Sequence, residues 1–300
     1  ILGVTSHLRK KILEQGGDPQ RETLTLIPTR NGNLLYEDSE GGFWRSYHFI
    51  ENATCHQSVD RPVLFTNAAK AFGHFQKLLA DYPADTLHET IAGFHNTVDR
   101  YALFEKAVAE DKAGRAASVE KEVRFFLDRK ADGAVVVDAI AKGQLPLRVT
   151  HNDTKLNNIM MDNDTDEGIC VIDLDTVMPG SVLYDFGDSI RFGASTADED
   201  ERDLSLVSMD LELFEAYTAG FLSEAGSSLT AEEIRLLPFS AKLLTLECGM
   251  RFLTDYLNGD TYFRIHREHH NLDRCRTQMK LVADMEYKME DMHKIVAKYV

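Results

Sequence analysis

Apolar residues recur every three or four positions at the start of the chain and again through most of it after residue 62. Val4, Leu8 and Ile12 follow this helical spacing until QGGDP, whose glycines and proline end a helix. The pattern then changes to three short apolar runs, LTLIPT, GNLLYE and FWRSYHFIE, separated by the turn sequences RNG and DSEGG. Such turns join antiparallel strands. The first 51 residues therefore predict one helix followed by a small antiparallel sheet.

The helical period dominates from Pro62 onward. The run VLFTNAAKAFGHFQKLLADYP predicts one helix, and three further helical stretches lie between Thr97 and Ala141. Thr230 and Glu233 form a capping box ahead of another long helix. The last helix carries an apolar stripe that indicates a packing surface: Leu272, Cys275, Met279, Val282, Met285, Met289, Met292 and Val296. The chain is thus predicted to be α+β, with residues 52–300 forming a large helical part.

One segment interrupts these helices. In VTHNDTKLNNIMMDNDTDEGICVIDLDTVMPG, the strand LRVT leads into the polar loop HNDTKLNN, and IMM and ICVI predict paired strands around the turn DNDTDEG. The second strand leads directly to Asp173, so Asp153 of the loop and Asp173 are expected to face one cleft. Asn158 lies between them and adds a neutral oxygen. Hard oxygen ligands in an open site suit Mg²⁺, which takes its remaining ligands from water and phosphates.

The spacing of these residues indicates their chemistry. The series His151-x-Asp153-x-Lys155-x-x-Asn158, followed by Asp173 after a hairpin, is the order of catalytic groups in kinase-like phosphotransferases. We hypothesise that Asp153 orients the acceptor hydroxyl and takes its proton, and that Lys155 offsets charge on the transferred phosphoryl group. Asn158 and Asp173 would hold Mg²⁺. Outside this context, such a loop is ordinary turn chemistry, and His151 is interpreted as a structural brace.

A second candidate for the metal aspartate lies in YDFGDSIRF. Asp185 follows the irregular sequence TVMPGSVL rather than a buried strand, so Asp185 and Asp188 are predicted to cap the next helix or to brace the catalytic loop. Three interpretations of Asp175 stay open at this point: a second metal ligand, a substrate contact or a loop brace.

The longer blocks around these motifs resemble a known family. THNDTKLNNIM, VIDLDTVMPG and YDFGDSIRFGAS are similar to the aminoglycoside phosphotransferase/choline kinase superfamily. FIENAT, AFGHFQ, LPFSAKLLTLECGMRFLTDYLNGD and RTQMKLV extend the likeness to those members that phosphorylate N-acetylhexosamines. The resemblance implies a bilobal kinase-like fold with ATP between the lobes. It also implies Mg²⁺-dependent transfer to the anomeric C1 hydroxyl of GlcNAc or GalNAc, giving the sugar 1-phosphate.

The resemblance further implies a linker strand, YHFIEN, in which the backbone of Phe49, Ile50 and Glu51 meets adenine. The chain departs from the family's pattern in the residues that precede this linker. Kinase-like N-lobes open with a glycine-rich strand pair that holds the phosphates. Before residue 51 the glycine pairs end a helix or lie in a hairpin turn. We therefore expect residues 1–51 to form a partial N-lobe that begins after those strands.

The acceptor contacts also rest on the resemblance, which implies that Arg251 and Tyr262 touch the sugar. From the residues alone, Arg251 lies four positions after Glu247, so an intrahelical ion pair is the alternative. Tyr262 follows the helix-ending Gly259, and simple packing there is its alternative.

Composition adds few constraints. The 300 residues carry a formal charge of −16, which disfavours nucleic acid and anionic membranes as partners. No apolar run approaches the ~20 residues that span a bilayer. The four cysteines lack disulfide or zinc spacing, so reduced thiols and a cytoplasmic location are expected. The pattern does not determine the oligomeric state.

Other functions stay open. A related kinase could act on choline, an aminoglycoside or another sugar. Asp173-Leu174-Asp175 has the DxD form of metal-dependent glycosyltransferases, although that interpretation leaves the Asp153 to Asn158 spacing unexplained. A non-catalytic pseudokinase is suggested by the missing glycine-rich strands and opposed by the catalytic residues. The tract HREHH is discounted as a metal site because it has no partner cluster.

Overall fold

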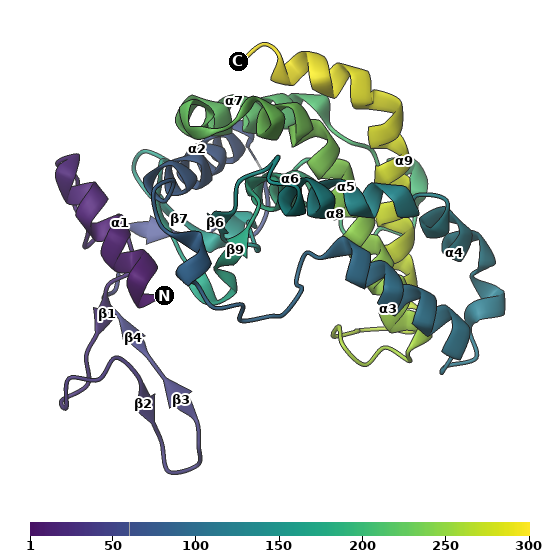
Figure 1. The fold of residues 1–300 in the computed structure, drawn as a ribbon, viewed down its shortest axis with the longest axis horizontal. Helices are drawn as coiled ribbons and strands as arrows, with labels where there is room; N and C mark the ends of the chain where they lie inside the picture. The colour runs from purple at the N-terminus through teal and green to yellow at the C-terminus, as the bar shows by residue number, and fades with distance from the viewer. Residues whose placement is uncertain (60) are drawn as a thin grey trace.

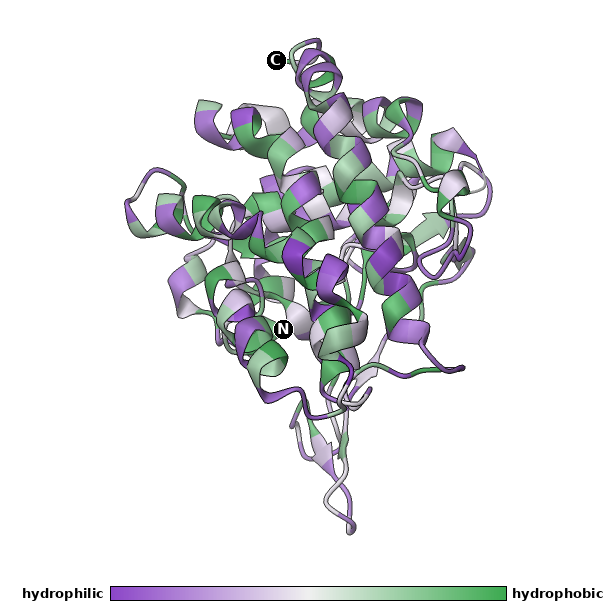
Figure 2. Cartoon of the chain, turned by 90° about the vertical axis from the view of Figure 1, so that its right-hand side faces the viewer, coloured by the Kyte–Doolittle hydropathy of each residue, from purple (hydrophilic) through white to green (hydrophobic). Residues whose placement is uncertain are grey.

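The computed structural model describes residues 1–59 and 61–300. Its N-terminal part holds helix α1 (Leu2–Glu14) and two antiparallel ribbons. Strand β1 (Leu26–Ile27) pairs with β4 (Ser46–Tyr47), and β2 (Tyr36–Glu37) pairs with β3 (Phe43–Trp44). In Figures 1 and 2 these ribbons project away from the helical body. The predicted helix and antiparallel strands are confirmed, although each strand is short.

Helices make up most of the remaining chain, as predicted. Their bounds are α2 (Pro62–Leu78), α3 (Thr97–Glu110), α4 (Glu120–Leu127), α5 (Ala134–Ala141), α6 (Val182–Gly193), α7 (Leu211–Ala225), α8 (Ala231–Leu257) and α9 (His270–Val296). Helix α2 packs on α7, and α8 packs on both α6 and α9. The capping box of Thr230 and Glu233 begins α8. Leu272, Cys275 and Met285 of the α9 stripe are buried, which confirms its packing role.

The β insert sits within this helical body (Figure 1). Strands β5 (Ala53–Thr54), β7 (Ile159–Asp162) and β8 (Gly168–Val171) form one antiparallel sheet, and β6 (Arg148–Thr150) pairs with β9 (Met178–Gly180). Two expectations were wrong. Strand β8 ends at Val171, before Asp173, and TVMPGSVL contains the regular strand β9. Pro179 lies opposite Val149 in this two-stranded pair, where an edge position tolerates its missing N–H.

Helix α6 is the most enclosed element near the insert. All of its residues except Phe192 are buried, including the charged Asp185, Asp188 and Arg191. Gly187 allows this helix to approach α8 closely, since a Cβ atom there would lie 2.5 Å from the backbone oxygen of Ser240. A buried helix with a fixed neighbour gives the insert a rigid support. None of the helices in the described residues is both long and apolar enough to cross a membrane.

Candidate active site

The loop between β6 and β7 is built around His151. Its Nε2 lies 2.8 Å from the carbonyl oxygen of Ile172, and its Nδ1 accepts a hydrogen bond from the backbone N–H of Asp153 at 3.3 Å. Asn152 has a φ of 65°, and its amide donates to the carbonyl oxygen of Thr176. The histidine thus ties the loop to the residue before Asp173. The structural interpretation of His151 is confirmed.

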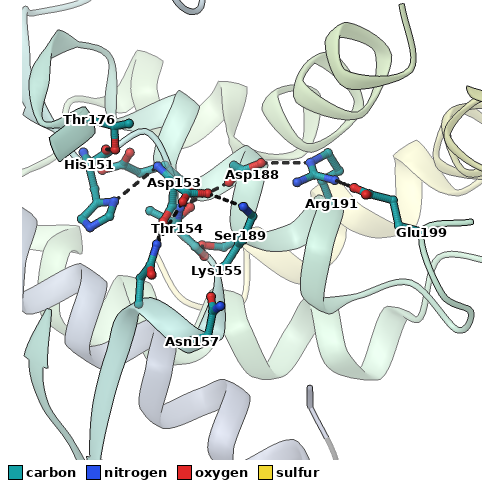
Figure 3. Close-up of polar contacts among 12 residues, drawn as sticks. His151, Asp153, Thr154, Lys155, Asn157, Thr176, Asp188, Ser189, Arg191 and Glu199 are labelled. Atoms are coloured by element: carbon teal, nitrogen blue, oxygen red, sulfur yellow. Dashed lines mark hydrogen bonds and ion pairs between the residues drawn. The ribbon is translucent and has the colours of Figure 1, made fainter. Parts of the chain in front are cut away.

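Three of the residues singled out in the loop lie together. The Asp153 carboxylate receives Lys155 Nζ on one oxygen at 2.8 Å and Asn158 Nδ2 on the other at 3.1 Å. Asn158 Nδ2 also donates to the Asp153 carbonyl oxygen at 2.8 Å. Figure 3 shows Asp153 and Lys155 facing each other beside Asp188 and Ser189 of α6. The carboxylate is therefore held in one orientation by a cation and an amide.

Asp173 is brought to the same place by the backbone of the hairpin. The N–H of Ile172 donates to the Asn158 carbonyl oxygen at 2.9 Å, and the chain then turns at Asp173, whose φ is 57°. In residues 1–59 and 61–300, neither the Asp173 carboxylate nor Asn158 Oδ1 accepts a hydrogen bond. These two oxygen groups are free to bind a hard cation such as Mg²⁺.

The same part of the chain holds no group of three or more His, Cys, Asp or Glu side chains placed to bind a metal. In the HREHH tract, His270 Nε2 instead lies 3.0 Å from Asp200. The remaining candidate for metal binding is thus the Asn158 and Asp173 pair, which depends on phosphate and water oxygens to complete a coordination shell.

Asp185 supports the catalytic loop from below. One carboxylate oxygen accepts the N–H of His151 at 2.9 Å and Gln76 Nε2 at 2.6 Å, and the other accepts the N–H of Asn152 at 2.8 Å. Burial raises the pKa of Asp185, and these donors together with His151 act in the opposite direction. Its predicted bracing role is confirmed. Gln76 was missed, because nothing in the α2 sequence distinguishes an inward-facing glutamine.

A second line of contacts runs from the loop along α6 (Figure 3). Asp188 accepts the N–H of Thr154 at 3.2 Å and Arg191 Nε at 2.9 Å, and Arg191 also pairs with Glu199 at 2.8 Å. Burial opposes the ionisation of Asp188, but Arg191, His95 and Lys155 outweigh it and lower its pKa. The neighbouring carboxylate of Asp153 likewise raises the pKa of Lys155 against the effect of burial. Asp188 and Lys155 are therefore both charged at neutral pH.

Asp175 faces the N-terminal part of the chain. Its carboxylate pairs with Arg45 at 2.5 Å, and its carbonyl oxygen accepts Thr90 Oγ1 at 3.0 Å. Among the three interpretations of Asp175, these contacts are those of a brace that joins the segment after the hairpin to Arg45, the residue between β3 and β4, and to Thr90.

The linker segment alternates between exposed and buried residues. Ile50 is buried in the core while the Phe49 side chain is 84% exposed. Arg21 Nη1 donates to the Glu51 carbonyl oxygen at 2.6 Å. The N–H groups of Phe49, Ile50 and Glu51 donate to no acceptor in the described residues. The segment thus has unused backbone donors, as a nucleotide-binding linker requires.

Arg251 and Tyr262 both lie beside the ring of Phe263. The alternative interpretation of Arg251, an ion pair with Glu247, is absent from the described residues, where the two Glu247 oxygens are bonded to His95 Nδ1 and Thr97 Oγ1, at 2.8 and 2.6 Å. Arg251 instead stacks near Phe263, and Tyr262 is 69% exposed beside that ring. Burial raises the pKa of Cys248 on the same helix, and the charges of Arg191 and Arg251 act in the opposite direction.

A catalytic loop supported by a buried helix, with a hairpin returning a second carboxylate to it, defines a kinase-like phosphotransferase. The model of the phosphotransferase enzyme family that includes the aminoglycoside phosphotransferases matches residues 29–219, and the chain belongs to that family. It is a small-molecule kinase of the aminoglycoside phosphotransferase/choline kinase superfamily. The predicted superfamily is confirmed.

Solved structures share the fold. An aminoglycoside phosphotransferase from Alicyclobacillus acidocaldarius aligns with a TM-score of 0.63 and 12% identity, covering 98% of this chain and 84% of that one. A microcompartment-associated aminopropanol kinase gives 0.60 and 16%, covering 96% and 83%. The GDP complex of aminoglycoside 2'-phosphotransferase-IIIa gives 0.53 and 11%, covering 92% and 82%. The predicted α+β kinase-like fold is confirmed.

Proposed function

We propose that the protein transfers the γ-phosphoryl group of ATP to the anomeric C1 hydroxyl of an N-acetylhexosamine. The observation that carries the phosphoryl-transfer part is the Asp153 carboxylate, which Lys155 and Asn158 orient, while the backbone just before Asp173 is bonded to Asn158. Phosphoryl transfer proceeds through a loose transition state, so an enzyme contributes mainly positioning and charge neutralisation. Clustered, well-oriented carboxylates and a lysine are suited to that task.

In this proposal Asp153 accepts the proton of the sugar hydroxyl as the bond to phosphorus forms. Its orientation matters, because a base must lie within hydrogen-bond reach of the proton it takes. Lys155, which is bonded to Asp153, lies where it can also offset charge on the transferred group. Burial and three donors hold Asp185 beneath the loop, so Asp153 is positioned before the substrate arrives.

Asn158 and Asp173 would hold Mg²⁺, which when bound neutralises charge on the nucleotide phosphates. Their free oxygen atoms fit this role, and the linker around Ile50 offers free backbone donors to adenine. A related phosphotransferase binds GDP in its solved structure, which supports a nucleotide as the co-substrate. Asp175 is proposed to contact the acceptor once its ion pair with Arg45 is broken.

The acceptor is proposed to be neutral because of the charges near Arg251. Burial and the positive charge of Arg251 lower the pKa of Arg100, while the carboxylates of Glu247 and Asp99 act in the opposite direction. A choline, amino alcohol or aminoglycoside would meet this positive charge, which disfavours a cationic acceptor. No oxygen in the described residues accepts a hydrogen bond from Arg251. Its donors, with the exposed Tyr262 hydroxyl, suit the hydroxyl and amide oxygens of a sugar.

The test is an ADP-release assay with Mg·ATP and a panel of GlcNAc, GalNAc, glucose, choline and kanamycin. We expect turnover with the N-acetylhexosamines, and ³¹P NMR of the product should show a phosphate coupled to the anomeric proton. Asp153→Asn should lower kcat by about 10²- to 10⁴-fold, the usual contribution of a general base. Asp291→Asn, the same change at an exposed position on α9, serves as the matched control.

Two results would count against the proposal. Turnover confined to choline or kanamycin would overturn the sugar acceptor while leaving the site intact. An Asp153→Asn variant as active as Asp291→Asn would overturn the assignment of the catalytic base.

A further inference from the structure

The Arg251 guanidinium lies between two aromatic rings that come from distant parts of the chain. Its central carbon is 5.3 Å from the centroid of Phe94 and 5.5 Å from that of Phe263. Arginine stacks favourably on aromatic faces, and a guanidinium held this way keeps its N–H edge free. We call Phe94, Phe263 and Arg251 the arginine clamp.

The Phe263 side of the clamp is fixed by Asp255 of α8. Asp255 is only 5% exposed, and its carboxylate accepts three consecutive backbone N–H groups, those of Thr261, Tyr262 and Phe263, at 2.8 to 3.0 Å. Hydrogen bonds to an ionised carboxylate are the stronger kind. One buried side chain therefore sets the path of the loop that carries both Tyr262 and the ring of Phe263.

The Phe94 side is fixed in a similar way. Arg100 donates twice to the Phe94 carbonyl oxygen, at 3.1 and 2.8 Å. The next residue, His95, is bonded to Glu247, which lies one helical turn before Arg251 on α8. Burial opposes the ionisation of Glu247, but His95, Arg251 and Thr97 together lower its pKa. Both halves of the clamp are thus anchored to α8 through buried carboxylates, those of Asp255 and Glu247.

We propose that Asp255 and the clamp rings are positioning residues that set the acceptor affinity of this kinase by aiming the N–H edge of Arg251 and the hydroxyl of Tyr262. This inference rests on the proposed function only in that Arg251 and Tyr262 contact the acceptor. The clamp acts on whichever alcohol the enzyme phosphorylates. Its loss is expected to raise the acceptor KM while sparing kcat and the KM of ATP, because the catalytic loop is held separately by α6.

The experiment compares Phe263→Leu, Phe263→Tyr and Asp255→Asn with wild type on the acceptor that the wild type turns over fastest. Phe263→Leu and Asp255→Asn should each raise the acceptor KM about tenfold, with the KM of ATP unchanged and kcat within about threefold. Phe263→Tyr keeps the aromatic face, so its acceptor KM should stay close to the wild-type value. Phe125→Leu is a matched control, since Phe125 stacks on Arg129 at 3.7 Å outside the site. Asp210→Asn is another, since Asp210 accepts two backbone N–H groups at the start of α7.

The outcomes separate this inference from the choice of acceptor. If the best acceptor is not an N-acetylhexosamine but its KM still rises in Phe263→Leu, the clamp stands and the sugar assignment falls. If Phe263→Leu and Phe125→Leu have the same acceptor KM, the clamp is refuted whichever acceptor is used. If Asp255→Asn fails to fold, the two Phe263 variants still decide the question, because Phe263 is only partly buried. If kcat falls in Phe263→Leu while the KM values of the acceptor and of ATP stay unchanged, a positioning role is also contradicted.

Discussion

Replacing Asp185 by asparagine probes how the catalytic loop is held. The carboxylate of Asp185 accepts three buried donors, Gln76 Nε2, His151 N and Asn152 N, at 2.6 to 2.9 Å. Asparagine has a single acceptor oxygen, so its NH₂ group must face at least one of these donors. An unsatisfied buried N–H costs about 1–3 kcal/mol, and the remaining bonds lose their charge assistance.

Part of this loss is offset. Burial raises the pKa of Asp185, so the neutral amide avoids the cost of burying a charge. We expect a net decrease of about 2–4 kcal/mol in the free energy of unfolding. Because Asp153 follows directly on the freed N–H groups, kcat should fall about tenfold or more.

Urea unfolding followed by circular dichroism measures the first effect, and the ADP-release assay measures the second. The matched control is Asp203→Asn, an exposed carboxylate that accepts the N–H of Ser205 at 3.0 Å, for which a loss of at most about 1 kcal/mol is expected. Equal stabilities of the two variants, with kcat at the wild-type value in both, would refute the view that Asp185 holds the loop.

Two further predictions concern packing and pH. Gly187→Ala should destabilise the protein by about 1–3 kcal/mol, because the new Cβ would lie 2.5 Å from the backbone oxygen of Ser240. The control is Gly226→Ala, whose Cβ meets nothing nearer than 3.8 Å and which should be neutral or stabilising. Thermal melts of both variants measure the difference. Asp188 and Glu247 have lowered pKa values in the folded state, so their stabilising effect is complete above the unfolded pKa and is lost as the pH falls through the folded one. The urea concentration at the midpoint of unfolding should therefore decrease when the pH is lowered below about 4. A midpoint that stays constant down to about pH 3 would contradict this linkage.

Much of the fold could be predicted from short stretches of sequence. Helical periodicity and the capping box identified α1, α2 and α8, and the turn sequences identified antiparallel strands in the first 51 residues. The same local logic grouped Asp153, Lys155 and Asn158, because a single loop carries all three and its geometry depends on residues close by. Turn chemistry and residue spacing are properties of the chain itself, so they can be recognised before any packing is known.

Long-range packing decided the rest. The segment that contains strand β9 was interpreted as irregular, and only its pairing with β6 makes it a strand. Glu247 is correctly spaced for an ion pair with Arg251, yet His95 and Thr97 reach its oxygens first because α3 begins beside α8. The clamp likewise brings together Phe94 and Arg251, which lie far apart in the sequence. Sequence determined which groups each segment carries, while the packing of α8 against its neighbours determined which of those groups meet, because a side chain's partner depends on faces that only the folded chain brings together.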